Sequence, residues 1–179
     1  MDGWEREVRS PDRLAAVERS GLVGIGPEDP LDRLIELAVE LVGVSCGVVA
    51  LVDSTHTTAM SAVGFPEGLV LAAPIDQSFC RFVVGAGRPF VVADANNDHR
   101  TIDDPAIEAF SAVAWAGYPI VDGDGAVLGT FCVMDASPHE WTTRDLHVLA
   151  TLAMAASTEI ALRRSQAELR SLRSGDDQT

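Results

Sequence analysis

The chain has 179 residues, 47% of them hydrophobic, which predicts one domain with a sizeable core and short appended segments. Its formal net charge is −14, from 13 basic and 27 acidic residues, and a negative field of this size repels nucleic-acid phosphates and anionic lipid. We therefore expect neither nucleic acid nor a membrane as a partner.

Export and membrane signals are weak in this sequence. No apolar run reaches the roughly 18 residues of a membrane-spanning helix. The first seven residues are charged and lack the apolar core of a signal peptide. The three cysteines are widely separated, which fits neither a disulfide framework nor a metal-ligand set. The simplest interpretation is a cytoplasmic protein with reduced thiols.

Two helices are predicted near the N-terminus. The first covers residues 10–22, with Ser10 as N-cap and Pro11 at the first helical position. The second follows the cap Asp29, and its apolar residues recur at helical spacing as far as residue 42. We expect residues 1–29 to form an N-terminal helix and connector, 30–163 the main domain, and 164–179 a helical extension with a disordered tail.

The middle of the chain alternates short strands and short helices. The patterns predict strands over 47–52, 57–63 and 89–93, helices over 78–84 and 105–111, and irregular segments over 64–76 and 94–104. The acidic segment 94–104 has two interpretations: a solvated loop, which we favour, or a lid that orders over a ligand. Its Asp94-x-Asn96-x-Asp98 spacing imitates a calcium loop, but His99 replaces the required glycine, so we expect turn chemistry and no metal.

Residues 113–135 predict a hairpin around Asp122-Gly-Asp-Gly, in which Gly123 and Asp124 take the positive φ values of a tight turn. That turn would place Ile120 opposite Val127 and Tyr118 opposite Gly129. Both strands are apolar on both faces, which is typical of central strands. Strand alternation places Trp115 and Tyr118 on opposite faces of the sheet.

The last helix is expected to begin after Thr142, which forms a capping box with Asp145, and to continue to about Leu172. At 1.5 Å per residue such a helix is roughly 45 Å long, more than a small sheet needs. Leu162 and Leu169 are seven residues apart, which is a heptad fragment. We therefore expect a homodimer built on the terminal helices. The order of elements predicts an α+β fold, an antiparallel sheet with helices on its faces.

Taken together, these segments resemble the GAF domain family of bacterial signalling proteins, over about residues 12–163. The resemblance rests on the motifs at 13–17, 30–34, 48–53, 78–80, 91–94, 116–119, 128–135 and 141–142. It implies a sheet of five or six strands, a small-molecule pocket on one sheet face, and terminal helices that pair in dimers. Members of the family bind cyclic nucleotides, bilins, haem or small metabolites.

Aromatic, acidic and thiol side chains near the implied pocket are the candidate ligand-binding residues. They are Phe79, Cys80, Phe82, Asp94, Trp115, Tyr118, Phe131, Cys132 and Asp135. Because Trp115 and Tyr118 face opposite ways, both can line one pocket only if a bulge intervenes. Cys80 lies near the N-terminus of the short helix predicted over 78–84, where it is either a small buried hydrophobe, the interpretation we favour, or a reactive thiol of lowered pKa.

The resemblance also narrows the ligand. The bilin-binding branch attaches its pigment to a cysteine followed by histidine, whereas Cys80 is followed by Arg81. The cyclic-nucleotide branch carries an Asn-Lys motif, and this chain has no lysine. We expect a non-catalytic sensory or regulatory module whose small-molecule ligand, cofactor and signalling partner protein are unknown. The alternatives are a small thiol redox enzyme, such as a free methionine sulfoxide reductase, or a pure dimerisation scaffold. Cys46 and Cys132 could also form a dithiol, because they lie near or in strands that could be neighbours.

Overall fold

The computed structural model describes residues 3–22, 29–66 and 71–176, and the predicted connector after residue 22 lies largely outside these ranges. In chain order the elements are α1 (Gly3–Val8), α2 (Pro11–Arg19), α3 (Asp29–Val42), β1 (Cys46–Val52), β2 (His56–Val63), β3 (Ala72–Pro74), a 3-10 turn (Ile75–Gln77), α4 (Cys80–Ala86), β4 (Phe90–Val92), α5 (Pro105–Phe110), β5 (Ala114–Val121), β6 (Val127–Asp135) and α6 (Thr143–Asp176). The sequence patterns missed α1 and β3, which are six and three residues long.

The strands form one antiparallel sheet in the order β3-β2-β1-β6-β5-β4. β1 and β6 are the central pair, and their even-numbered and odd-numbered residues face opposite layers. β2 lies near one edge, as its mixed composition predicts, and is covered there only by the short β3. The predicted α+β architecture is confirmed.

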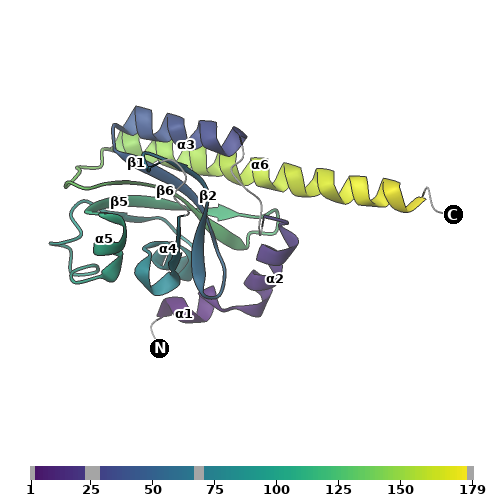
Figure 1. The fold of residues 1–179 in the computed structure, drawn as a ribbon, viewed down its shortest axis with the longest axis horizontal. Coiled ribbons are helices and arrows are strands. Elements are labelled where there is room, and N and C mark those ends of the chain that lie inside the picture. The colour runs from purple at the N-terminus through teal and green to yellow at the C-terminus, as the bar shows by residue number, and fades with distance from the viewer. Residues whose placement is uncertain (1–2, 23–28, 67–70, 177–179) are drawn as a thin grey trace.

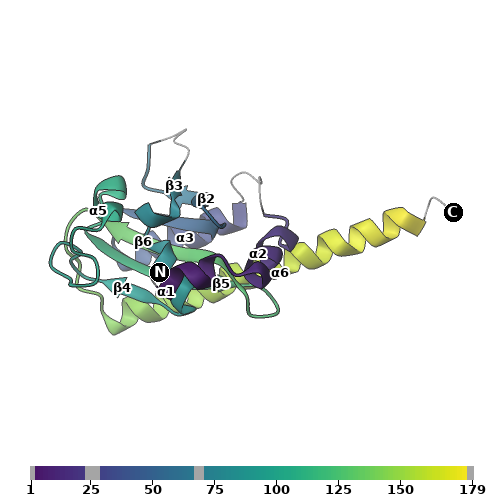
Figure 2. The same ribbon diagram turned by 90° about the horizontal axis from the view of Figure 1, so that it is seen from below.

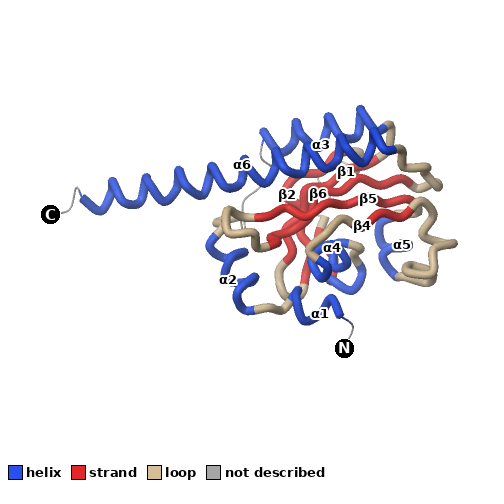
Figure 3. Tube along the Cα trace, turned by 180° about the vertical axis from the view of Figure 1, so that it is seen from behind, coloured by secondary structure: helices blue, strands red, loops and turns tan. Residues whose placement is uncertain are grey.

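Helices cover both faces of the sheet (Figures 1 and 3). On one face, α3 and α6 lie side by side over a core that includes Val49, Leu51 and Phe131. On the other face, α1, α4 and α5 cover a second core that includes Val48, Ala50 and Trp115. Neighbouring residues of β1 thus enter different cores, which is why the whole strand reads as a continuous apolar run.

The β5–β6 hairpin is present, but its predicted register is wrong by two residues. Ile120 pairs with Gly129 and Tyr118 with Phe131, because a bulge follows Ile120 and the turn takes more residues. The Asp122 carboxylate accepts from the backbone N–H groups of Asp124 and Ala126. Gly125, with φ +86°, adopts the left-handed conformation that was predicted for Gly123 and Asp124. A shift of two residues leaves the side chains of β5 and of β6 after Gly129 on their predicted faces. The bulge exchanges the faces of Val127 and Leu128, so that Val127 lies on the face of Cys132 and Leu128 on the face of Phe131.

The N-terminal helices are tied to the sheet by Arg13, which is 3% exposed. Its guanidinium donates to the carbonyl oxygens of Val8, Val52, Asp53 and Val127. These carbonyls come from the end of α1, the end of β1 and the start of β6. One buried cation therefore joins three segments that are far apart in the sequence.

The last helix leaves the domain. The Thr142 hydroxyl accepts from the Asp145 N–H and the Asp145 carboxylate accepts from the Thr142 N–H, so the predicted capping box is confirmed. As far as Ile160 the helix packs on the sheet and α3, and beyond it α6 extends away from the body (Figure 2). By length and composition Thr143–Arg170 is apolar enough to cross a membrane, but the buried side chains of its first half identify it as a core helix.

Candidate functional site

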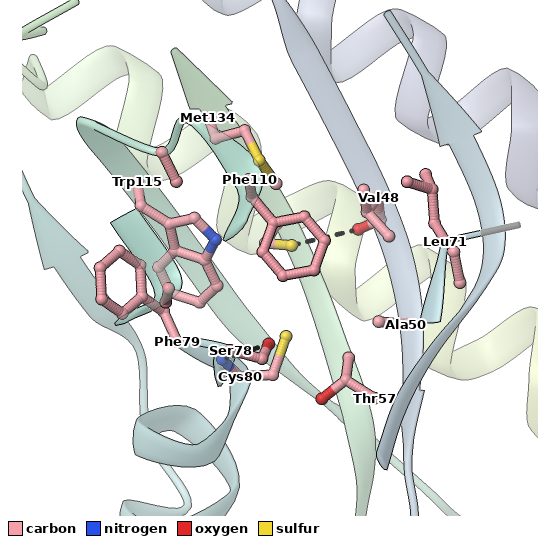
Figure 4. Close-up of a pocket in the computed structure, with 14 residues that line it drawn as sticks. Val48, Ala50, Thr57, Leu71, Ser78, Phe79, Cys80, Phe110, Trp115 and Met134 are labelled. Atoms are coloured by element: carbon pink, nitrogen blue, oxygen red, sulfur yellow. Dashed lines mark hydrogen bonds between the residues drawn. The ribbon is translucent and has the colours of Figure 1, made fainter. Parts of the chain in front are cut away.

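Small side chains leave a cavity on the sheet face that α4 and α5 cover. Its floor is made by alternate residues of β1, β2 and β6, and its walls come from α4, α5 and the segment before β5. The lining residues are Val48, Ala50, Thr57, Ala59, Leu71, Ser78, Phe79, Cys80, Ala106, Phe110, Ala112, Trp115, Cys132 and Met134 (Figure 4). The cavity measures about 30 Å³. That is room for one or two water molecules and far less than the roughly 300 Å³ of a typical metabolite pocket.

Aromatic rings form one wall of the cavity. Phe79 meets Trp115 edge to face, with ring centroids 5.8 Å apart, and Phe82 and Phe90 extend this contact away from the cavity. The indole of Trp115 lies over Gly117, where an added Cβ would stand 2.1 Å from the ring. An aromatic ring thus covers a glycine of its own strand, β5.

A thin wall separates the cavity from an open groove of about 500 Å³. Leu71 and Phe110 line both spaces, and both side chains are only partly buried. In the view of Figure 4, the Phe110 ring lies between Trp115 and Leu71. Ser111, which ends α5, holds a left-handed conformation with φ +52°, which is uncommon for a residue other than glycine. Leu71 and Phe110 are thus shared by the walls of the cavity and of the groove.

Few polar groups face this space. No charged side chain lines the cavity among the described residues. The Ser78 hydroxyl accepts from the Cys80 N–H at 3.3 Å. The Thr57 hydroxyl is buried and has no hydrogen-bond partner within the part of the chain that the structure describes. An unpaired buried hydroxyl costs stability, so its position in a cavity wall marks a place where a ligand atom or a water can bind.

Two thiols also face the cavity. Cys80 Sγ lies 3.0 Å from Thr130 Oγ1, and Cys132 Sγ donates weakly to the Val48 carbonyl at 3.5 Å. A hydrogen bond from Cys132 lowers the pKa of Cys80 to about 7, against the opposing effect of burial. The same contact, together with burial, raises the pKa of Cys132. The first proton lost by the pair therefore leaves Cys80, and Cys132 stays protonated beside the thiolate.

The structure brings together four of the nine predicted site residues: Phe79, Cys80, Trp115 and Cys132 line the cavity. Phe82 stands behind Phe79 in the same core.

Tyr118 and Phe131 were wrongly expected here, because strand alternation places both on the opposite face. The Tyr118 hydroxyl donates there to the Leu146 carbonyl.

The two predicted acids lie away from the cavity. Asp94 accepts from Asn96 and Asn97 in a turn, and Asp135 accepts from Ser45 and Ser137 at the edge of the sheet. No residue of the acidic segment 94–104 lines the cavity. Asp104 instead caps α5 and pairs with the buried Arg81 of α4. These contacts favour the solvated-loop interpretation over the lid.

Ten of the fourteen lining residues had no predicted role, among them Thr57, Leu71 and Phe110. Of these, Thr57 had a signal in the sequence, because it is a polar residue at the start of a predicted strand that is rich in small residues. The cavity is not the largest hollow. A polar groove of about 610 Å³ lies between α2, the end of α4 and the β5–β6 turn. The cavity differs from this groove in its mostly apolar walls, which also hold an unpaired hydroxyl and two thiols.

Comparison with known proteins agrees with the fold. Residues 26–160 match the GAF domain family. A curated relative, Cyclic di-GMP phosphodiesterase PA2567 from Pseudomonas aeruginosa, is 25% identical over 155 residues, which cover 86% of this chain and 26% of the relative. This chain therefore spans about a quarter of that protein's length.

Solved structures of low sequence identity share the fold. The GAF domain of an Acinetobacter phosphoenolpyruvate-protein phosphotransferase superposes with a TM-score of 0.65 at 17% identity, covering 89% of this chain and 99% of that one. The GAF-B domain of DevS from Mycobacterium smegmatis gives a TM-score of 0.61 at 16% identity, covering 78% and 96%.

Proposed function

Because the chain belongs to the GAF domain family, we propose that it is a non-catalytic sensory module whose state is set by a small molecule in the cavity beneath α4. The similar chains include a domain of a putative two-component sensor histidine kinase protein from Sinorhizobium meliloti and a segment of a cyclic di-GMP phosphodiesterase, in line with a regulatory role in signal transduction. We place it in the cytoplasm. The enzymatic alternative has less support, because the family and the fold both belong to regulatory modules.

The observation that carries this proposal is the unpaired hydroxyl of Thr57 in the wall of an otherwise apolar cavity. A buried polar group without a partner is retained at a cost of about 1–3 kcal/mol. A ligand that supplies the missing hydrogen bond removes this cost and gains the apolar contact of the surrounding walls. Thr57 thus defines the polar end of the binding site.

The walls indicate the chemistry of the ligand. Since no charged group in the described lining could neutralise an ion, a charged ligand would lose its hydration without compensation. We infer an uncharged, mostly apolar molecule with one hydrogen-bonding group. It enters from the groove of about 500 Å³ by displacing Leu71 and Phe110, because the cavity of about 30 Å³ is too small as it stands.

The output is proposed to pass through α6. This helix packs over β5 and β6 with its first half and carries its second half clear of the domain (Figure 1). Cys132 and Trp115 line the cavity from these same two strands. A ligand that shifts β5 or β6 therefore acts on the surface to which α6 is attached.

We also propose that two copies pair through α3 and α6. Apolar side chains remain exposed along both helices, at Leu37, Leu41, Met154, Leu162, Leu169 and Leu172. Leu162 and Leu169 are 52% and 59% exposed on the part of α6 beyond the sheet. Exposed leucines at heptad spacing are typical of a coiled-coil seam. The same surface is available to a signalling partner protein.

A thermal-shift screen of uncharged metabolites tests the ligand proposal. A ligand at 100 times its Kd stabilises the protein by about 2.7 kcal/mol, which corresponds to roughly 5–10 °C in a domain of this size. In Thr57→Val the ligand's polar group loses its partner, so we expect the Kd to rise roughly 5- to 150-fold. Thr58→Val is the matched control, because Thr58 is exposed on the same strand. Equal Kd values in the two variants would contradict the assignment of Thr57.

A further inference from the structure

Cys80 and Cys132 both line the cavity, although 52 positions (132 − 80) separate them in the sequence. Thr130 and Cys132 are two residues apart on β6 and therefore face the same side of the sheet. Cys80 lies beside this pair: its Sγ is 3.0 Å from Thr130 Oγ1, and Cys132 lines the same cavity and belongs to the same buried core as Cys80. Both thiols are buried, at 4% and 1% exposure, and both line the cavity.

The third cysteine provides an internal comparison. Cys46 is only half-buried, and its Sγ donates to the Gly64 carbonyl at 3.3 Å. Burial and the nearby Asp135 carboxylate raise its pKa. It lies opposite Met134 on β6, so the dithiol pairs Cys132 with Cys80 and not with Cys46. Exposure alone would make Cys46 the reactive thiol, whereas thiolate character favours Cys80.

We propose that Cys80 and Cys132 form an oxidation site at which a small hydroperoxide converts the two thiols into a disulfide between α4 and β6. The Cys80 thiolate attacks the terminal peroxide oxygen, the O–O bond breaks, and the leaving oxygen departs as water or an alcohol after taking up the proton released by Cys80. Cys80 is then a sulfenic acid. The Cys132 sulfur attacks the Cys80 sulfur, the S–O bond breaks, and the hydroxyl leaves as water with the Cys132 proton. The two thiols lose two electrons in total and the peroxide gains them.

The cavity selects the oxidant by size. A space of about 30 Å³ admits one or two water-sized molecules, which suits hydrogen peroxide and excludes bulky disulfides. The Thr130 hydroxyl stands beside Cys80 Sγ and can donate to the thiolate. Cys132 is the one titratable side chain besides Cys80 among the described lining residues. Besides Cys132, the Ser78 and Thr130 hydroxyls also lower the pKa of Cys80, while burial raises it. This modification does not depend on which metabolite the cavity binds.

Intact-mass analysis of the full chain tests the proposal. After one equivalent of hydrogen peroxide, the reduced protein is expected to lose the mass of two hydrogen atoms, and peptide mapping to recover a Cys80–Cys132 cross-link that dithiothreitol reverses. In competition, Cys80 should react at least about tenfold faster than Cys46. The rate should rise with pH, reach half of its maximum near pH 7 and level off at higher pH, because the Cys80 thiolate, whose thiol has a pKa of about 7, is the reacting species.

Variants separate the two chemical steps. Cys132→Ala is expected to stop at a sulfenic acid on Cys80 that dimedone traps, Cys80→Ala to abolish oxidation at Cys132, and Cys46→Ser to behave as the wild type. The wild-type cross-link map requires no variant, so the test survives if an alanine variant fails to fold. Preferential oxidation of Cys46, or a cross-link that contains Cys46, would overturn the proposal, as would unchanged mass at several equivalents of peroxide. The oxidation is measured on ligand-free protein, because a metabolite in the same cavity would shield the two thiols. The two proposals therefore fail separately.

Discussion

Replacing Thr57 with valine is expected to stabilise the ligand-free protein, although it removes a polar group from a buried strand. The Thr57 hydroxyl is buried and unpaired among the described residues, and such a group costs about 1–3 kcal/mol. Valine has nearly the same shape and the same preference for a strand. We expect the free energy of unfolding to rise by about 1 kcal/mol, which corresponds to roughly 2–4 °C in Tm for a chain of this length.

Urea unfolding of the wild type, Thr57→Val and Thr58→Val measures this difference. The exposed Thr58 should change by less than about 0.5 kcal/mol. The proposed function adds a second requirement, that Thr57→Val binds the ligand more weakly while being the more stable protein. If Thr57→Val unfolds more easily than the wild type, the hydroxyl has a partner in the free protein, and the reasoning that makes it the ligand's anchor is refuted.

Further predictions concern the rest of the fold. Arg13→Met leaves two buried carbonyl acceptors unsatisfied and should lower the free energy of unfolding by about 3 kcal/mol. Arg19→Met, at an exposed position of the same helix, should change it little. Equal losses in the two variants would contradict the role of Arg13 in joining the three segments. Leu162→Asp should convert a dimer to a folded monomer in light scattering and remove the dependence of Tm on protein concentration. A wild-type monomer at tens of micromolar would refute the dimer. A hydrogen bond from Arg100 lowers the pKa of Asp98 to about 2, so the Asp98 carboxylate stabilises the folded protein slightly above about pH 5 and loses this effect as pH falls towards 2. In urea titrations, Asp98→Asn should therefore be slightly less stable than the wild type at neutral pH and equally stable near pH 2. A difference that grows on acidification would contradict this sign.

Strand periodicity and helix caps predicted most of the architecture because these signals are local. Ser10-Pro11 and the Thr142–Asp145 capping box lie where the helices begin. Alternation assigned Trp115 and Tyr118 to the correct faces. The hairpin register was less secure, because Asp122-Gly-Asp-Gly offers several turns of different length, and the choice depends on how the Asp122 side chain caps the turn.

The site was harder to predict because it depends on contacts between distant elements. No local pattern reports that the hydroxyl of Thr57 lacks a partner, or that Phe110 of α5 reaches a cavity on β1 and β6. The pairing of Cys80 with Cys132 likewise follows from the packing of α4 on the sheet. Residue type alone identified Phe79, Cys80, Trp115 and Cys132, and it included the Asp94 and Asp135 carboxylates that the fold uses elsewhere.

Native mass spectrometry of the protein purified from its own host tests the central claim most directly. The wild type is expected to carry one small, uncharged molecule per chain. Ala50→Val adds two methyl groups to the cavity wall and should remove that molecule, while Ala62→Val adds the same groups at an exposed position of β2 and should retain it. A wild-type protein that is free of any adduct, or an adduct that Ala50→Val keeps at full occupancy, would contradict a sensory site in this cavity.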